Sequence, residues 1–125
     1  MTEITLTIPL IPPSVNHYKM RNRRTGRWYV TKQALAFKSA VAVFARGASV
    51  EGKAYSLDVT VFLGKRGRGD GDNFFKCIAD GLKDARVIRS DAGIKDWRIK
   101  VDRDWANPRT VLTVKTLPAA DRLSA

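Results

Sequence analysis

The chain has 125 residues, 44% of them hydrophobic, and a formal net charge of +11. A chain of this length folds as one domain that buries roughly two-thirds of its unfolded surface, and its hydrophobic content excludes a disordered tail. Residues 4–50 contain eight lysines and arginines and no acidic residue. This asymmetry favours a polyanionic partner, most simply nucleic acid, over a merely soluble basic protein or a membrane-surface protein.

Cysteine and histidine each occur only once, which limits the kinds of catalytic or metal site that the chain can form. Cys77 is the only cysteine, so no internal disulfide forms, as is usual in the reducing cytosol. Because Cys77 lies in an apolar helical pattern, we predict a buried core thiol rather than a nucleophile. His17 is the only histidine, which excludes a zinc site built from several histidines. The chain has neither a signal peptide nor about 18 consecutive apolar residues, so we expect a cytoplasmic protein with no membrane role.

The first part of the chain predicts a strand and a basic hairpin. Apolar and polar side chains alternate over residues 4–10, which is typical of a strand. The prolines of Pro12-Pro13-Ser14-Val15-Asn16 then favour an extended exit. Residues 18–30 hold the densest basic run, with a turn signal at Thr25-Gly26 and a short return strand after it. We interpret Trp28-Tyr29 as a covering of the sheet rather than as a platform on which bases stack.

The middle of the chain predicts a helix and then the clearest strand. Thr31 is a suitable N-cap, and apolar residues recur after it with helical spacing. We expect this whole apolar stripe to be core; it consists of Ala34, Phe37, Val41, Phe44 and Ala48. Residues 55–63 alternate between apolar and polar side chains, which predicts a strand with one buried face.

The last part of the chain predicts a second helix and two further strands. Residues 74–82 place apolar side chains on one helical face, and strands follow around 97–101, with one charged face, and around 111–114. We therefore predict an α+β fold, with a mixed or antiparallel sheet carrying two main helices in one compact domain over residues 1–117. Residues 118–125 are expected to form a flexible C-terminal tail.

A glycine-rich basic segment, Gly64 to Gly69, delivers two carboxylates and leads into the second helix. Asp70 and Asp72 share one face of an extended segment, and Lys76 follows Asp72 by one helical turn. Mg²⁺ prefers oxygen ligands, and Asp91 is the third carboxylate if the connector before it returns along the helix. A bound magnesium ion acidifies its water and neutralises charge on a phosphate, and a lysine stabilises the same charge. The cluster therefore indicates Mg²⁺-dependent phosphodiester hydrolysis.

Two other motifs fail on spacing, whereas simpler structural roles for these acids and for Lys76 stay open. An EF-hand loop that begins at Asp70 fails, because phenylalanines occupy a ligand position and the glycine position. The glycines also lack the Gly-Lys-[Ser/Thr] ending of a P-loop. Asp72 suits a helix N-cap, Lys76 suits an ion pair with Asp72 or Asp80, and Asp91 suits an ordinary connector. Asp80 is interpreted as structural, or as a support for the site.

The segment that carries this cluster resembles the signature of the RusA-type Holliday junction resolvases. It reads Asp70-Gly-Asp72-Asn73-Phe-Phe-Lys76-Cys-Ile-Ala-Asp80-Gly-Leu82, and both Pro12-Pro13-Ser14-Val15-Asn16 and Tyr29-Val30-Thr31 agree with it. The resemblance covers about residues 4–116. It implies a small, homodimeric, Mg²⁺-dependent endonuclease that resolves four-way DNA junctions by paired symmetrical nicks in recombination and repair. Many such proteins are encoded by prophages.

The resemblance also implies roles for particular residues. By the matching positions, Asp70, Asp72 and Asp91 are the metal-binding acids and Lys76 is the catalytic lysine, with no small-molecule cofactor. The family pattern usually has a second acid just before the third aspartate, where this chain has Ser90. Gly93-Ile94 likewise replaces a more usual polar residue followed by valine.

Basic residues on the predicted hairpin and on the glycine-rich segment are candidates for contacts to branched double-stranded DNA. They are Lys19, Arg21, Arg23, Arg24, Arg27, Lys65, Arg66 and Arg68. Two other functions stay open. The chain would be a non-catalytic basic DNA-binding module if the aspartates only cap helices and form ion pairs. It would be a nuclease for other branched DNA if the same magnesium site acts on flaps or three-way junctions.

Overall fold

A four-stranded sheet forms the centre of the computed structural model, which describes residues 1–118. The strands are β1 (Glu3–Ile8), β6 (Arg109–Thr116), β4 (Tyr55–Leu63) and β5 (Ile94–Arg103), in that spatial order. β6 is antiparallel to both of its neighbours, whereas β4 and β5 are parallel. The sheet is therefore mixed, as predicted. The expected tail lies, from residue 119 onward, outside the described residues.

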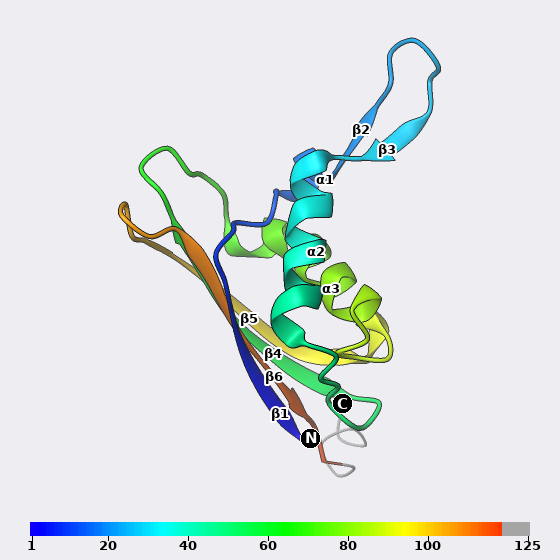
Figure 1. The fold of residues 1–125 in the computed structure, drawn as a ribbon, viewed down its shortest axis with the longest axis vertical. Coiled ribbons are helices and arrows are strands. Elements are labelled where there is room, and N and C mark those ends of the chain that lie inside the picture. Colours follow the sequence, from blue (N-terminus) through cyan, green and yellow to red (C-terminus); the bar gives the residue numbers. More distant parts are fainter. Residues whose placement is uncertain (119–125) are drawn as a thin grey trace.

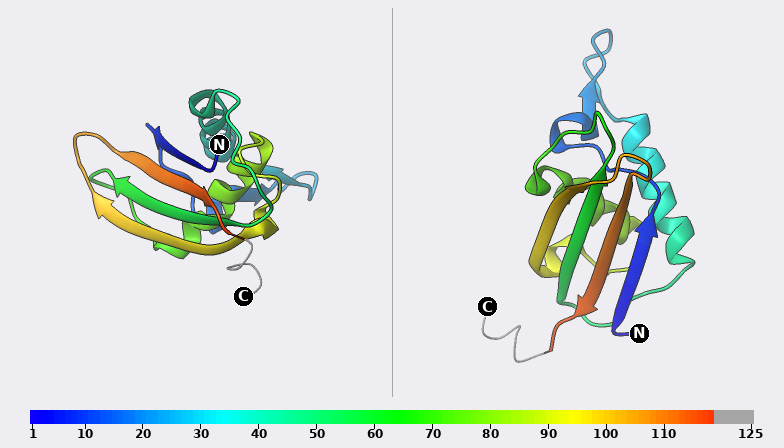
Figure 2. Two further views of the ribbon diagram at one scale, coloured as in Figure 1. Left: turned by 90° about the horizontal axis from the view of Figure 1, so that it is seen from below. Right: turned by 90° about the vertical axis from the view of Figure 1, so that its left-hand side faces the viewer.

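Two main helices cover one face of this sheet, as predicted: α2 (Lys32–Ala45) and α3 (Phe75–Asp84). Figure 1 shows both helices on one side, and Figure 2 shows the opposite face of the sheet without a covering layer. The alternating residues of β4 explain this arrangement, because its apolar side chains are buried under the helices while the intervening ones are less buried. Among residues 1–118, no helix is long and apolar enough to cross a membrane.

Helix α2 begins and ends at identifiable capping residues. The predicted N-cap is confirmed, because Thr31 Oγ1 accepts a hydrogen bond from the Ala34 amide at 3.3 Å. Arg46 ends the helix in the left-handed conformation, with φ of 52°. The predicted apolar stripe is wrong at Phe44, whose side chain is 45% exposed, and at Ala48, which lies beyond the end of the helix and is only partly buried. Ala45 is buried instead, because the next inward position after Val41 is four residues along the helix rather than three.

The parallel pairing of β4 and β5 requires a crossover, and this crossover carries the acidic segment. The chain leaves β4, forms the short helix η1 (Gly71–Phe74), continues as α3, and reaches β5 through η2 (Asp91–Gly93). Cys77 on α3 is buried, which confirms the predicted core thiol, and this burial raises the pKa of the thiol to about 12.

A separate two-stranded sheet stands away from the domain (Figure 1). The short helix α1 (Val15–Tyr18) leads into β2 (Lys19–Arg21), which pairs with β3 (Trp28–Val30). The predicted basic hairpin is thus confirmed. The interpretation of its aromatic residues is wrong, however, because Trp28 is 67% exposed and covers no sheet.

Candidate active site

The glycine-rich segment is held against its surroundings at two positions that admit no side chain. Gly69 has φ of +143°, and a Cβ there would clash with the ring of Phe74. A Cβ on Gly71 would clash with the backbone carbonyl oxygen of Ile99 in β5. The two glycines flank Asp70 and place the start of η1 directly on the edge strand. The sequence therefore fixes the position of the acidic segment through close backbone approach.

Asp70 and Asp72 lie at the start of η1 with exposed side chains. Asp70 occupies the N-cap position and Asp72 the first turn, yet no side chain caps this helix. Among residues 1–118, neither carboxylate forms a hydrogen bond or an ion pair, unlike Asp80, Asp84, Asp91 or Asp104. The alternative that Asp72 serves as an N-cap is therefore wrong, and both carboxylates are accessible to a ligand.

Lys76 lies one helical turn after Asp72 but interacts with Asp80. Its Nζ is 3.4 Å from both carboxylate oxygens of Asp80, and the lysine side chain is still 52% exposed. This bears out the ion-pair interpretation for Asp80. The phenol of Tyr18 donates to Asp80 at 2.7 Å. Burial and this hydrogen bond raise the pKa of Tyr18. Asp80 thus links the lysine to the root of the hairpin.

Asp91 is the first residue of η2, and its environment differs from that of the other two acids. It is half-buried, and its Oδ1 accepts a hydrogen bond from the Ala92 amide at 3.1 Å. The same amide donates to Ser90 Oγ at 3.2 Å. The preceding connector folds back onto the end of α3, where the Val87 amide donates to the Leu82 carbonyl at 2.9 Å. These contacts fasten the start of the connector to the end of α3, and η2 itself lies against α3.

No group of three or more His, Cys, Asp or Glu side chains within residues 1–118 is placed to hold a metal ion. The structure thus brings Asp70 and Asp72 together on one short helix but does not assemble them with Asp91. The donor chemistry of the first pair still fits a hard cation, since Mg²⁺ takes one or two carboxylates and completes its shell with water. An ammonium group follows Asp72 by one helical turn, on the exposed side chain of Lys76.

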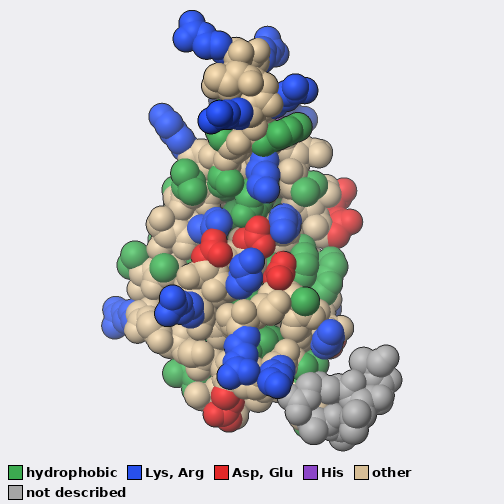
Figure 3. All heavy atoms as spheres, turned by 90° about the vertical axis from the view of Figure 1, so that its right-hand side faces the viewer, with side chains coloured by type: hydrophobic (Ala, Val, Ile, Leu, Met, Phe, Trp, Pro, Cys, Tyr) green, Lys and Arg blue, Asp and Glu red, His purple; other side chains and the backbone are tan. Residues whose placement is uncertain are grey.

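The candidate DNA-binding residues lie on two exposed segments, and the glycine-rich one leads directly into Asp70. All eight are exposed, five of them on or beside the projecting hairpin and three on the glycine-rich segment. Figure 3 shows acidic side chains gathered in the middle of one face, with lysine and arginine side chains around them and on the hairpin above. A phosphate backbone that reaches the acids would therefore be flanked by positive charge.

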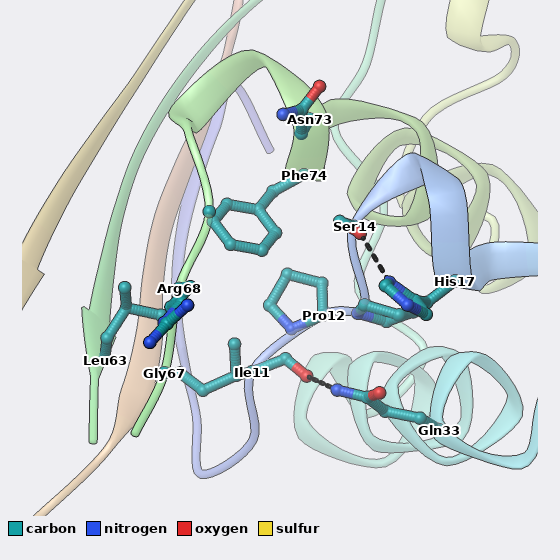
Figure 4. Close-up of a pocket in the computed structure, with 12 residues that line it drawn as sticks. Ile11, Pro12, Ser14, His17, Gln33, Leu63, Gly67, Arg68, Asn73 and Phe74 are labelled. Atoms are coloured by element: carbon teal, nitrogen blue, oxygen red, sulfur yellow. Dashed lines mark hydrogen bonds between the residues drawn. The ribbon is translucent and has the colours of Figure 1, made fainter. Parts of the chain in front are cut away.

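A cavity of about 440 Å³ beside the acidic segment was not foreseen from the sequence. Its lining includes Asn73, His17 and Gln33, which come from three separate elements (Figure 4). The signal that could have pointed to it is the proline-rich stretch from Pro12, which forms one wall. The contact between Tyr18 and Asp80 was also missed, because 62 residues separate the two in sequence.

Comparison with known proteins identifies the family of the chain. Residues 9–115 match the family described as Endodeoxyribonuclease RusA. The match includes the hairpin, the acidic segment, α3 and η2, and it leaves out little more than the two ends of the chain. No curated protein matches the chain significantly. The family match confirms the resemblance seen in the sequence, and the chain therefore belongs to the RusA family of endodeoxyribonucleases, the Holliday junction resolvases.

Proposed function

We propose that this endodeoxyribonuclease cuts four-way DNA junctions by Mg²⁺-dependent hydrolysis, with paired symmetrical nicks, at a site built on Asp70 and Asp72. One observation carries the proposal. Two exposed carboxylates without a partner among residues 1–118 occur together in a protein of net charge +11. A protein that only binds DNA gains nothing from such a pair, because the carboxylates repel phosphates. A cation between carboxylates and phosphate removes that conflict.

Each residue of the site then has a defined task. Asp70 and Asp72 would hold the magnesium ion, and Asp91 would supply the third carboxylate of the family pattern. When bound, the ion supplies a more acidic water and neutralises charge on the phosphate. Lys76 stabilises the developing charge or donates a proton to the leaving oxygen. Asp80 orients Lys76, since its carboxylate lies 3.4 Å from the ammonium group.

The basic hairpin and the glycine-rich segment hold the junction arms through backbone phosphates. Because five to eight phosphates are expected to be neutralised, the log–log dependence of binding on salt should have a slope of about −5 to −7. The exposed aromatic residues of the hairpin, Trp28 and Tyr29, are available to stack on bases at the crossover. An affinity that hardly changes with salt would contradict this role.

We further propose a homodimer that acts in the cytoplasm, where its DNA substrate lies. A four-way junction has near two-fold symmetry, so two paired nicks need two sites in a fixed relation, which a two-fold dimer provides. The edge strand β5 supports this proposal. Its apolar side chains Trp97 and Val101 are 40% and 38% exposed next to η1, and a second copy would cover them.

The test uses the purified protein, Mg²⁺ and synthetic DNA. We expect symmetrical nicks in a four-way junction, and fewer nicks in three-way and linear DNA of the same sequence in competition. A shifted but intact junction would favour the non-catalytic binding module. Equal cutting of three-way junctions or flaps would favour a nuclease for other branched DNA, with the same site and a different substrate.

A further inference from the structure

The cavity of about 440 Å³ lies directly beside the acidic segment. Gly69 and Asn73, which come immediately before Asp70 and after Asp72, both line it. The opposite wall comes from the proline-rich stretch at Ile11 to Ser14, and the first turn of α2 closes one end with Gln33. The cavity is thus formed where two distant segments of the chain meet next to the candidate catalytic acids.

The inner part of this cavity is apolar. Figure 4 shows the rings of Phe74 and Pro12 directed into it from opposite walls, with Ile11 and Leu63 beside them. The glycine-rich segment follows this apolar surface closely, because a Cβ on Gly67 would lie 3.0 Å from Leu63 Cβ. Flat rings and small contacts of this kind suit the faces of a planar heterocycle.

The rim of the cavity is polar and only partly used. Ser14 Oγ lies 3.0 Å from His17 Nδ1, and no other side-chain hydrogen bond of His17 is present within residues 1–118. Gln33 donates to the Ile11 carbonyl at 3.5 Å through its amide nitrogen, which leaves its amide oxygen as an acceptor. Arg68 adds a positive charge at the rim. These groups suit the edge of a heterocycle that carries donors and acceptors.

We propose that this cavity receives a single nucleobase of the DNA substrate, turned out of its stack, while the adjoining phosphate lies at Asp70 and Asp72. The proposal rests on the proposed function, and it assigns a further binding site to the same reaction. The volume lies within the range of about 300–1,000 Å³ that is usual for ligand sites. The two parts of a nucleotide also match the two parts of this region. The base suits the apolar cavity, and the phosphate suits the basic segment two or three residues away.

The structure of the DNA junction lowers the free-energy cost of turning a base out of its stack. Enzymes turn a base out of its stack most easily where the base is already poorly stacked or unpaired. At the crossover of an open four-way junction the bases remain paired but lack a stacking neighbour on one side. A base held in the cavity would be read at its edge by His17 and Gln33, so these two residues would set a preference for the sequence at the cut.

The direct test uses 2-aminopurine, whose emission rises when it leaves a base stack. It is placed beside the cleaved phosphate of a four-way junction, and saturating Asp72→Asn protein keeps the DNA uncut. We expect a clear rise in emission. The rise should be lost when His17→Ala and Gln33→Ala are added, and it should remain with Ser39→Ala, an exposed position on α2 outside the cavity lining.

A second measurement uses a junction that can migrate through many sequences. Without the Asp72 substitution, His17→Ala with Gln33→Ala should reduce the ratio of cutting between the best and worst sites by about fivefold or more, whereas Ser39→Ala should leave it unchanged. Flat emission on a bound junction, or an unaltered ratio, would overturn the base site. If the unmodified protein binds the junction but never cuts it, the proposed function fails instead, and the emission measurement still decides the base site.

Discussion

The two short helices η1 and η2 both begin at or next to an aspartate, and both lie between a loop and a longer element. Their carboxylates differ, because those of η1 are free of hydrogen bonds within residues 1–118 and that of η2 accepts one. In η1, glycines press the backbone against Phe74 and β5, and the carboxylates of Asp70 and Asp72 have no partner among residues 1–118. In η2, Asp91 bonds to the amide of the next residue. Short helices that carry aspartates thus give an accessible pair of ligands in one place and a satisfied turn in the other. The difference has two sources: tertiary contacts of glycines fix η1, whereas hydrogen bonds within the turn satisfy Asp91 in η2.

The largest effect is expected from η1. Asp70→Asn or Asp72→Asn should lower the rate of Mg²⁺-dependent nicking by about 1,000-fold or more, because a lost carboxylate ligand costs several kcal/mol of charge stabilisation. Single-turnover nicking and a gel-shift assay measure rate and junction binding separately. Asp58→Asn, on an exposed position of β4, is the matched control and should change neither. Loss of binding together with cutting in a folded variant would contradict the metal role.

A smaller loss of nicking rate is expected from substitutions in η2, and it tests whether the acids of η1 and η2 differ in importance. Asp91→Asn should reduce nicking by about 100-fold, with partial recovery at high Mg²⁺, because a site that keeps two carboxylates still binds the ion weakly. Ser90→Ala removes only the neighbouring hydroxyl that accepts from the same amide, and it should cost about threefold or less. Full activity of Asp91→Asn would mean that the site works with the η1 pair alone.

The glycines of η1 provide a test of the contacts themselves. Gly69→Ala combines a left-handed backbone with a clash against Phe74, and it should lower the free energy of unfolding by about 2–4 kcal/mol. Gly47 is the matched control, since it has φ of +77° with nothing within 4 Å of an added Cβ. Gly47→Ala should therefore cost only about 1 kcal/mol. Urea unfolding measures both, and equal costs would show that the contact with Phe74 is unimportant.

The smallest effect concerns Tyr18, through which Asp80 is tied to the hairpin. Its pKa is raised in the folded state by burial and by the hydrogen bond to Asp80. The unfolded chain therefore loses this proton first as the pH rises above 10.0, and stability falls over that range by up to about 1.4 kcal/mol per pH unit. Urea unfolding at pH 9 and pH 11 should show a steeper decrease for the natural protein than for Tyr18→Phe. Parallel decreases would contradict the buried, hydrogen-bonded phenol.

Much of this fold could be predicted because its elements are locally periodic. The alternation over residues 55–63 and the stripe from Ala34 to Val41 each gave the correct element, and Thr31 was correctly identified as the N-cap. Phe44 was misjudged because a single helical pattern does not show which of two adjacent positions the sheet will cover. Trp28 was misjudged because a strand that pairs only with its hairpin partner has no second layer to bury it.

The candidate site was predictable only in part for a related reason. Asp70, Asp72 and Lys76 lie within seven residues, so their spacing and the direction of one helix place them together. Asp91 depends on the path of a connector, and that path is decided by backbone hydrogen bonds to the end of α3. The cavity depends on a proline-rich segment more than fifty residues away from Asn73. Only the assembled domain brings such segments together.

The root of the hairpin has an evolutionary consequence. The Thr31 amide donates to the Tyr18 carbonyl at 3.0 Å, and Thr31 Oγ1 donates to the His17 carbonyl at 2.8 Å, so the two strands are fastened together where they leave the domain. Residues Lys19 to Tyr29 are outside that fastening and share no strand pairing with the main sheet, whereas Val30 packs against the core. The hairpin can therefore be lengthened, shortened or grafted from another protein without disturbing the core. If the hairpin holds the DNA as proposed, substrate choice and chemistry are free to diverge independently.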